Sequence, residues 1–532
     1  MCSYNALNGV PTCADPYLLQ TILREHWGWT NEDQYVTSDC DAIQNIYIPH
    51  NYTSTREQAV ADALIAGTDL NCGTYYQSHL PSAYNEGLFN ESVIDQALIR
   101  QYSALVKLGY FDPASATPYR SLDFTNVSTP YAESLALKAA EEGIVLLKND
   151  GTLPLSLPTT GNISIALIGS WANATTQMQG NYFGIPPFLH SPLYAAQRLP
   201  GVTVNYAAGV GGQGDPTTNS WQIALSAANT SDVIIVADGI DTSVEAEGMD
   251  RYTIDWTAAQ QDLLTQLAAM GKPTILLQMG DQLDDSPFLE NQNISAILWG
   301  GYPGQDGGTA LMNVLFGKTA PAGRLPVTQY PAAYVNEVPM TDMNLRPNAS
   351  SGNPGRTYKW YNESVLPFGF GLHYTNFSVE FGNGETAATM SHDISSLVSN
   401  CTTSNSTKYL DLCPFVSVPI SVQNTGSVTS DFVVLLFLAG EFGPQPYPIK
   451  QLVAYERLFG IRGGETKTVE LEPTLGSLAR YDESGNQVLY PGGYSLLVDV
   501  PTQVTLNFTL TGSESVLDAW PGREGGERMR EQ

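Results

Sequence analysis

Two clusters of carboxylates in this sequence could do chemistry. Asp39 and Asp41 end the apolar stretch "YVTS", and the segment "DTSVEAEGMDR" at 241–251 follows the apolar run "DVIIVADGI". Retaining glycosidases use two carboxyl groups roughly 5–5.5 Å apart, one as a nucleophile and one as an acid and base. Structural alternatives remain open here, because an aspartate can cap the helix that follows it and an acidic loop can simply be solvated.

The first 112 residues alternate short apolar segments with helical patterns. "YVTSD" and "TDLNCG" favour strands, whereas "TREQAVADALIAG" and "NESVIDQALIRQYSALVKLGYF" favour amphipathic helices. Such alternation indicates a parallel sheet or barrel, in which functional residues gather at the carboxyl ends of the strands. Asp39 falls at such an end. Residues 113–132 are polar, contain proline and lack periodicity, so we expect a linker there.

Two further domains follow. Continuous apolar runs such as "ISIALIGS", "DVIIVADGI" and "PTILLQMG" predict an open, doubly wound α/β domain over 133–335. A connecting segment covers 336–374. Short strands with turn residues between them, such as "DFVVLLFLA" and "TKTVELEP", predict a β-sandwich over 375–512. We expect the tail, 513–532, to be disordered. The predicted fold class is thus multidomain α/β plus β.

The charge balance narrows the class of partner. Acidic residues outnumber basic ones 53 to 24, for a formal net charge of −29. Nucleic acids and anionic membranes need basic patches, so we expect neither as a partner. No apolar run approaches the length of a membrane-spanning helix. No CxxC pair or EF-hand spacing occurs and the six histidines are scattered, so we predict no metal and no cofactor.

Glycosylation motifs indicate the compartment. Thirteen Asn-x-Ser/Thr sites occur, where chance would give about five, and this excess predicts a secreted glycoprotein. Six cysteines agree with an oxidising compartment. No signal peptide is visible. The sites are Asn51, Asn90, Asn126, Asn162, Asn173, Asn229, Asn293, Asn348, Asn362, Asn376, Asn400, Asn405 and Asn507.

The chain resembles glycoside hydrolase family 3, and within it the fungal and plant β-xylosidase branch. The resemblance runs through nearly the whole sequence, in "MCSYNALNGVPTCAD", "YVTSDCDAI", "AGTDLNCGTYY", "EEGIVLLKNDGTLPL", "VEAEGMDR", "WGGYPGQDGG", "PAGRLPVTQYP" and "LPFGFGLHYTNF". It implies a (β/α)8 barrel, an α/β sandwich and a fibronectin type III-like β-sandwich. It also implies an exo-acting, retaining enzyme that releases terminal xylose from xylo-oligosaccharides.

The resemblance also implies roles for single residues. Asp39 matches the family's nucleophile and Glu247 its acid and base, with Glu245 as the alternative because the loop is variable. Tyr4 resembles a tyrosine that lines the sugar-binding subsite, whereas Asp41 is expected to be structural. Two disulfides are expected, one beside the nucleophile and one in the third domain, joining Cys40 to Cys72 and Cys401 to Cys413.

Family members begin with earlier barrel strands that this sequence lacks, so we expect 1–112 to be the C-terminal part of a barrel. About three of eight strands would remain, which predicts a truncated chain, inactive or nearly so by itself. Two alternatives stay open, an α-L-arabinofuranosidase or bifunctional enzyme and a non-catalytic saccharide-binding fragment. The sequence does not predict the oligomeric state.

Overall fold

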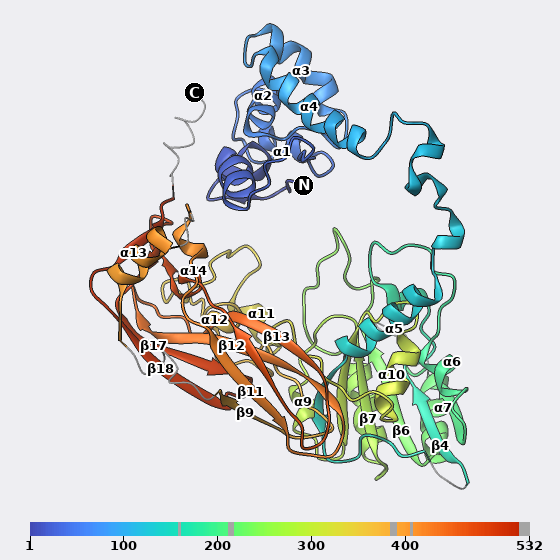
Figure 1. Ribbon diagram of the computed structural model, residues 1–532. Coiled ribbons are helices and arrows are strands. Elements are labelled where there is room, and N and C mark those ends of the chain that lie inside the picture. The colour runs from blue at the N-terminus through green and yellow to red at the C-terminus, as the bar shows by residue number, and fades with distance from the viewer. Residues whose placement is uncertain (158–160, 211–217, 383–390, 405–407, 521–532) are drawn as a thin grey trace. The chain divides into compact units, whose positions relative to one another are not determined.

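A computed structural model describes residues 1–157, 161–210, 218–382, 391–404 and 408–520 (Figure 1). The chain divides into two compact units. Unit 1 comprises Met1–Asn126, Tyr481–Gln487 and the segment from Val516 onward, and unit 2 comprises Val127–Arg480 and Val488–Ser515. Within the described ranges, no helix has both the length and the apolar character that crossing a bilayer requires.

Unit 1 is mainly helical. Both predicted amphipathic helices form, as α2 and α4, and the first of them has clear end signals. The Thr55 side chain accepts a hydrogen bond from the Gln58 amide at the start of α2, and Gly67 ends it at a φ of 106°. The apolar face of α2 packs into the core of the unit. The helices are η1 (Thr12–Ala14), η2 (Tyr17–His26), α1 (Ala42–Tyr47), α2 (Arg56–Ala66), α3 (Tyr75–Asn85) and α4 (Glu91–Lys107).

The strands expected in unit 1 are reduced to single bridges. Ser38 bridges Cys2 and Thr37 bridges Leu70, both in parallel, so three extended segments lie side by side. The buried Asp69 carboxylate joins two of these segments by accepting from the Val36 amide at 2.8 Å. A β-ladder needs consecutive paired residues along two neighbouring strands, and in the described part of the chain these segments form only single bridges. The barrel remnant is therefore not confirmed.

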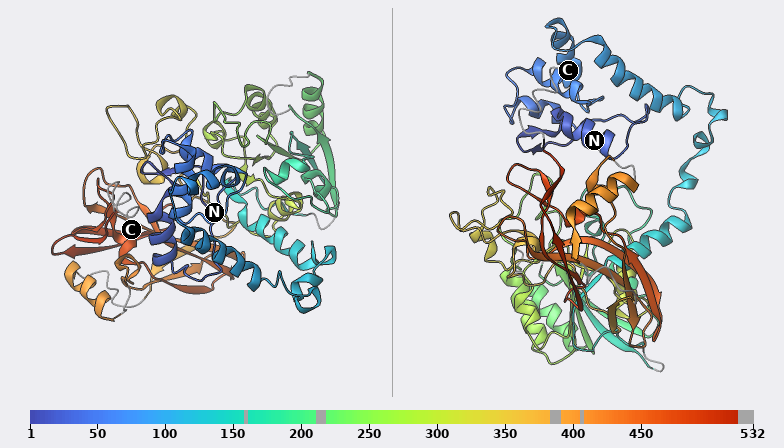
Figure 2. Two further views of the ribbon diagram at one scale, coloured as in Figure 1. Left: turned by 90° about the horizontal axis from the view of Figure 1, so that it is seen from above. Right: turned by 60° about the vertical axis from the view of Figure 1, so that its left-hand side comes forward.

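Two further segments complete the description of unit 1. The segment expected to be a linker contains three short turns, η3 (Ala114–Ala116), η4 (Pro118–Ser121) and η5 (Phe124–Asn126), which follow α4 in the chain (Figure 2). The tail is not wholly disordered, because β19 (Ser515–Asp518) joins β15 (Arg480–Tyr481) and β16 (Gln487–Leu489) in a small sheet. The Tyr17 hydroxyl donates to Asp518 at 2.9 Å and its ring packs edge-on against Trp520. Residues 521–532 of the tail lie outside the described residues.

Unit 2 contains the predicted open α/β sheet, in the order β3-β8-β7-β6-β4-β5. All neighbours are parallel except β3, which pairs antiparallel with β8 at one edge. Helices α5, α6 and α10 cover one face, and α7 and α8 the other. The elements are α5 (Pro130–Gly143), β3 (Val145–Asn149), β4 (Ile163–Ile168), α6 (Pro192–Ala196), β5 (Val202–Ala207), α7 (Thr218–Asn229), β6 (Val233–Gly239), α8 (Ala258–Ala268), β7 (Thr274–Met279), α9 (Ser286–Leu289), β8 (Ala296–Gly301) and α10 (Gly307–Leu315).

The rest of unit 2 contains the predicted β-sandwich, whose strands are drawn in orange to red in Figure 1. One sheet has the order β10-β18-β17-β12-β13 and the other β14-β11-β9. The buried Arg324 guanidinium ties the α/β part to the sandwich through Asp499 at 2.9 Å. The elements are α11 (Tyr334–Glu337), α12 (Thr357–Trp360), β9 (Phe377–Phe381), β10 (Ser391–Asp393), α13 (Ile394–Ser404), η8 (Leu410–Leu412), β11 (Val418–Asn424), β12 (Ser430–Phe442), β13 (Gln451–Ile461), β14 (Thr466–Leu471), α14 (Leu475–Leu478), β17 (Gly492–Val498) and β18 (Val504–Thr511).

Candidate active site

Asp39 lies directly after the bridged residues Thr37 and Ser38, at the carboxyl end of its extended segment. Its amide donates to the Cys2 carbonyl at 2.8 Å, and its carboxylate accepts from the Cys40 amide at 2.7 Å. Asp41 has a left-handed backbone at the start of α1 and makes no side-chain cap there. Among the described residues neither carboxylate caps α1, so the structural alternative for this cluster loses its main support.

Tyr4 lies on a neighbouring segment of unit 1. The short hairpin β1 (Ala6–Leu7) and β2 (Val10–Pro11) follows it, with Asn8 and Gly9 in the turn at φ values of 48° and 87°. Asn-Gly is the preferred pair for such a turn, so this hairpin was predictable from the sequence although we did not predict it. The Tyr4 carbonyl lies 2.6 Å from Nε2 of His50, and the side chain is 40% exposed. The ring is therefore accessible to a ligand.

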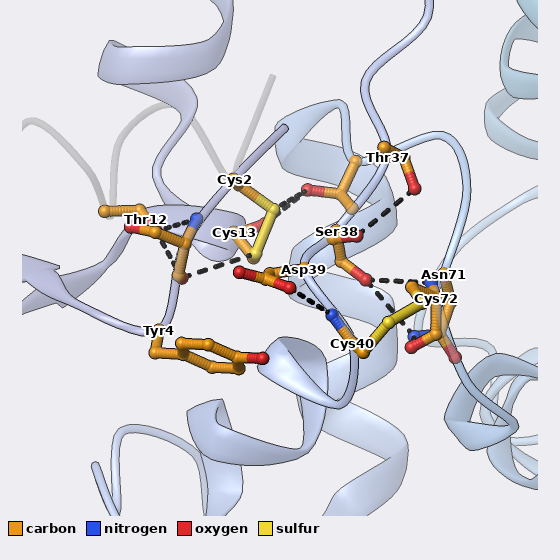
Figure 3. Close-up of a disulfide and its surroundings, with 12 residues drawn as sticks. Cys2, Tyr4, Thr12, Cys13, Thr37, Ser38, Asp39, Cys40, Asn71 and Cys72 are labelled. Atoms are coloured by element: carbon orange, nitrogen blue, oxygen red, sulfur yellow. Dashed lines mark hydrogen bonds between the residues drawn. A yellow bond between two sulfur atoms is a disulfide. The ribbon is translucent and has the colours of Figure 1, made fainter. Parts of the chain in front are cut away.

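Disulfides brace the segments that carry Asp39 and Tyr4 (Figure 3). Cys40 is joined to Cys72, the pair that the family resemblance implies, and Cys2 is joined to Cys13, a pair that was not predicted from the sequence. The Ser38 hydroxyl also accepts from the Cys72 amide at 3.0 Å. Covalent and hydrogen-bonded ties therefore hold the peptide on both sides of the Asp39 carboxylate.

Glu247 lies at the tip of a tight turn in unit 2. Ala246 and Met249 exchange two backbone hydrogen bonds, of 3.1 and 2.9 Å, so Glu247 and Gly248 form the two turn residues. Gly248 has a φ of 74°, a backbone conformation that favours glycine at the second turn position. The Glu247 side chain is exposed. The turn thus presents this carboxyl group at the end of a short, defined arm.

Glu245 has a different environment. Its carboxylate accepts from the Tyr302 hydroxyl at 2.9 Å and pairs with Nε of Arg251 at 3.0 Å. Burial raises the pKa of Glu245, while the Arg251 charge and the Tyr302 hydrogen bond oppose this rise. Arg251 also donates to the Gln282 carbonyl at 2.9 Å. Glu245 therefore anchors the base of the turn, and Glu247 is the carboxylate that remains available.

A pocket of about 390 Å³ surrounds this turn within unit 2. Asn181 and Tyr302 line it together with residues of the segment 242–251, including both glutamates. The pocket is open to solvent and mixes polar and apolar walls, as saccharide-sized sites do. Tyr302 and Asn181 were not predicted from the sequence, because nothing in their local pattern shows that the chain returns to the acidic loop.

The remaining predicted sites are placed as follows. Cys401 in α13 is joined to Cys413 after η8, and both side chains are buried. Of the thirteen glycosylation motifs, Asn348 is partly buried, Asn405 lies outside the described residues, and the asparagines of the other eleven are exposed. Asp39 and Tyr4 belong to unit 1, whereas Glu247 belongs to unit 2.

Comparison with known protein families covers three stretches of the chain. Residues 1–103 match the glycosyl hydrolase family 3 N-terminal domain, and residues 144–374 match the family 3 C-terminal domain. Residues 432–500 match a fibronectin type III-like domain. The exposed turn with Glu247 thus lies in the family's C-terminal domain, and Asp39 in its N-terminal domain.

Known proteins are similar over almost the whole chain. A probable exo-1,4-β-xylosidase, bxlB, of Aspergillus fumigatus is 54% identical over 530 residues, 98% of this chain and 66% of that protein. A probable exo-1,4-β-xylosidase, xlnD, of Neosartorya fischeri is 53% identical over 525 residues, with the same coverage. The chain therefore spans slightly less than two thirds of the length of these relatives.

Solved structures are also similar to this chain over nearly its whole length. A GH3 exo-β-xylosidase (XlnD) in complex with a xylobiose aziridine activity-based probe is 44% identical, with a TM-score of 0.90 over 99% of this chain and 67% of that one. A β-glucosidase from Listeria innocua, 22% identical with a TM-score of 0.76 over 96% of this chain and 68% of that one, shares the fold. The chain belongs to glycoside hydrolase family 3.

Proposed function

We propose that this family 3 chain carries the chemistry of an exo-acting, retaining β-xylosidase, which releases terminal xylose from xylo-oligosaccharides. The observation that carries the proposal is that Glu247 is exposed on a turn that contains Gly248, while a separate glutamate, Glu245, is paired with Arg251 and Tyr302 at the base of this turn. The relatives' names support xylosides as the substrate class. The low charge density and strong acidic excess agree with a neutral substrate.

In this proposal Asp39 is the nucleophile. Its carboxylate attacks the anomeric carbon, the bond to the leaving oxygen breaks, and Glu247 gives its proton to that oxygen. Glu247 then takes a proton from a water molecule, whose oxygen displaces Asp39 and frees the sugar. Two groups that act in this way must come within roughly 5–5.5 Å of each other during the reaction. The ties of Asp39 to Cys2 and Cys40 favour a nucleophile that is held in one orientation.

A trapping experiment tests the nucleophile. When the chain is incubated with a 2-fluoro-xyloside that carries an activated leaving group, the proposal predicts one xylosyl group on the Asp39 peptide, whereas the expectation of a truncated, inactive chain predicts no label. Asp39→Asn should take up no label, and the matched variant Asp41→Asn should still be labelled. Label on any other carboxylate would contradict the assignment. Saccharide binding without any label or turnover would instead support a non-catalytic, sugar-binding role.

A second experiment separates Glu247 from Glu245. With a dinitrophenyl xyloside, whose leaving group needs no acid, Glu247→Gln should form the glycosyl-enzyme at nearly normal speed but hydrolyse it slowly. Azide needs no general base, so it should restore turnover and produce a xylosyl azide of retained configuration. Glu245→Gln should show no such rescue, because Glu245 acts through the turn. Rescue of Glu245→Gln alone would reverse the two roles.

Two structural expectations belong to the same proposal. The parallel bridges at Ser38 and Leu70, together with the family match, support residues 1–112 as the C-terminal part of a (β/α)8 barrel. The exposed glycosylation motifs and the three disulfides support a secreted glycoprotein. Digestion of the protein from a eukaryotic host with an endoglycosidase should lower its mass if these sites are used.

A further inference from the structure

The side-chain amide of Asn71 connects the segment that carries Asp39 to helix α3. Its Nδ2 donates to the Ser38 hydroxyl at 3.3 Å and to the Cys72 carbonyl at 2.8 Å (Figure 3). Its Oδ1 accepts from the Tyr76 amide at 3.0 Å, at the start of the helix. A backbone amide only donates and a carbonyl only accepts, so these partners fix which way the Asn71 amide faces.

The main chain of Cys72 is hydrogen-bonded to the residues before and after Asp39. Its amide donates to the Ser38 hydroxyl at 3.0 Å, and its carbonyl accepts from the Asp41 amide at 3.0 Å. Ser38 also donates its own amide to the Leu70 carbonyl at 2.8 Å. Asp39 therefore lies in the middle of a short stretch whose two ends are bound to the same loop.

None of these hydrogen bonds uses a sulfur atom. They join backbone atoms and the side chains of Ser38 and Asn71, so replacement of Cys40 and Cys72 by serine would leave every donor and acceptor in place. Ser38 is 0% exposed, and loss of its hydroxyl would leave buried donors without their acceptor. The loop thus holds the Asp39 peptide in two independent ways, by the disulfide and by this network.

We propose that Asn71 and Ser38 are positioning residues for Asp39, and that their hydrogen bonds hold its peptide in one orientation even without the Cys40–Cys72 disulfide. A carboxylate that attacks along one direction depends on such positioning, because small misplacements of a reacting group lower the rate strongly. This inference rests on the proposed function, since it concerns the orientation of the proposed nucleophile. If the disulfide alone held the peptide, the two side chains would contribute only to the stability of unit 1.

Hydrogen exchange of the full chain, followed by mass spectrometry, tests the network without any need for turnover. The amides of Asp39 and Asp41 are the reporters, because they donate to the Cys2 and Cys72 carbonyls. Their exchange is compared with that of α2, which reports the opening of unit 1 as a whole. We expect this ratio to be the same in the wild type and in a disulfide-free chain that carries Cys40→Ser with Cys72→Ser.

Ser38→Ala is the informative variant. In the disulfide-free chain it should raise the exchange of the reporter amides, relative to α2, about three- to tenfold, the effect of one hydrogen bond. Asn71→Asp should act similarly, because it keeps the oxygen that accepts from Tyr76 and loses the donor to Ser38. The matched control is Thr37→Val, whose lost hydroxyl donates to the carbonyl of the next residue in the same segment, and it should leave the ratio unchanged.

Two results would overturn the proposal. One is loss of protection at the reporter amides in the disulfide-free chain by itself, while α2 stays protected, because the disulfide would then be the only tie. The other is equal exchange in Ser38→Ala and Thr37→Val. If the disulfide-free chain does not fold, the same two variants are compared in the disulfide-bonded chain, where equal exchange again overturns the proposal.

Labelling kinetics with the 2-fluoro-xyloside separate positioning from folding. Ser38→Ala should lower the maximal rate of labelling at Asp39 about three- to tenfold, and the reagent concentration that gives half of this rate should not change. A change in that concentration alone would contradict a positioning role. Absence of label in the wild type would count against the proposed function, whereas the exchange experiment would still decide this inference.

Discussion

Replacement of Arg251 by methionine should loosen the turn that carries Glu247. The guanidinium makes three interactions: with Glu245 at 3.0 Å, with Asp281 at 3.3 Å and with the Gln282 carbonyl at 2.9 Å. Methionine keeps much of the side-chain volume and removes all three. The turn residues lie between Glu245 and Arg251 in sequence, so this change releases one end of the arm that presents the carboxyl group.

The size of the expected loss of unfolding free energy depends on how exposed the paired side chains are. The side chains of Arg251 and Glu245 are 16% and 19% exposed, whereas that of Asp281 is 50% exposed. A hydrogen bond between charged, mostly buried groups contributes about 1.5–3 kcal/mol, and a half-exposed pair contributes well under about 1 kcal/mol. We therefore expect Arg251→Met to lower the unfolding free energy of unit 2 by about 2–3 kcal/mol, mostly through Glu245.

A double-mutant cycle in urea measures this. The variants Arg251→Met, Glu245→Gln and their combination should give a coupling energy of about 1.5–3 kcal/mol. The same cycle with Asp281→Asn in place of Glu245→Gln is the matched control and should give less than about 1 kcal/mol. Equal coupling energies in both cycles, or no coupling between Arg251 and Glu245, would refute the idea that Arg251 holds Glu245 at the base of the turn. Glu245 would then be as available for chemistry as Glu247.

The pH dependence of Arg251→Met has a definite sign. Burial already raises the folded pKa of Glu245 above its ordinary value of 4.5, and the Arg251 charge opposes that rise. Loss of the charge raises the pKa further. The folded state then holds a proton that the unfolded state has released, so the unfolding free energy falls as pH rises from 4.5 through the folded pKa. We expect a steeper fall in the variant than in the wild type.

Three further predictions concern other parts of the chain. Burial, with Arg324 nearby, lowers the pKa of His373 from 6.5 to about 3, so between pH 6.5 and 5 this histidine should remove about 1.6 kcal/mol of unfolding free energy, and His373→Phe should be less destabilised by acid than the wild type by that amount. The same change of unfolding free energy with pH in both proteins, measured by urea denaturation, would contradict this. Cys40→Ser with Cys72→Ser opens a loop closed over 32 residues and should destabilise unit 1 by about 3–4 kcal/mol, seen as a lower urea midpoint; an unaltered midpoint would speak against the bond. Gly248→Ala has no neighbour within 4 Å of its new Cβ but keeps a φ of 74°, so it should cost about 1 kcal/mol through backbone strain alone, and a larger loss in a thermal melt would point to a clash.

Several elements were predictable because their signals are local. The residues at both ends of helix α2 define its bounds. The Thr55 side chain accepts a hydrogen bond from the Gln58 amide at the start, and Gly67 ends the helix in the left-handed conformation. The strands β6 and β7 are buried along their whole length, as their continuous apolar runs predict. Such features depend on a few neighbouring residues, so the sequence alone was sufficient for them.

Other elements depended on partners far along the chain. "YVTSD" has the composition of a strand, but the structure provides only single bridges at Thr37 and Ser38, because a regular strand forms only where a second segment pairs with it over several residues. The tail was wrongly expected to be disordered throughout, since its order depends on Tyr17, which contacts Asp518 and Trp520 from about 500 positions away.

The candidate site also has some features that the sequence predicts and others that depend on the tertiary structure. The sequence by itself determined which residue types could do acid–base and nucleophilic chemistry, and the family pattern at Asp39 and Glu247. It left Glu245 as an alternative, because the two glutamates stand in the same short segment. Only the tertiary structure gives them different environments, by bringing Tyr302 from the end of β8 and Arg251 to the carboxylate of Glu245. Burial and pairing are properties of three-dimensional neighbours, so only the tertiary structure could show that Glu245 is paired and that Glu247 is exposed.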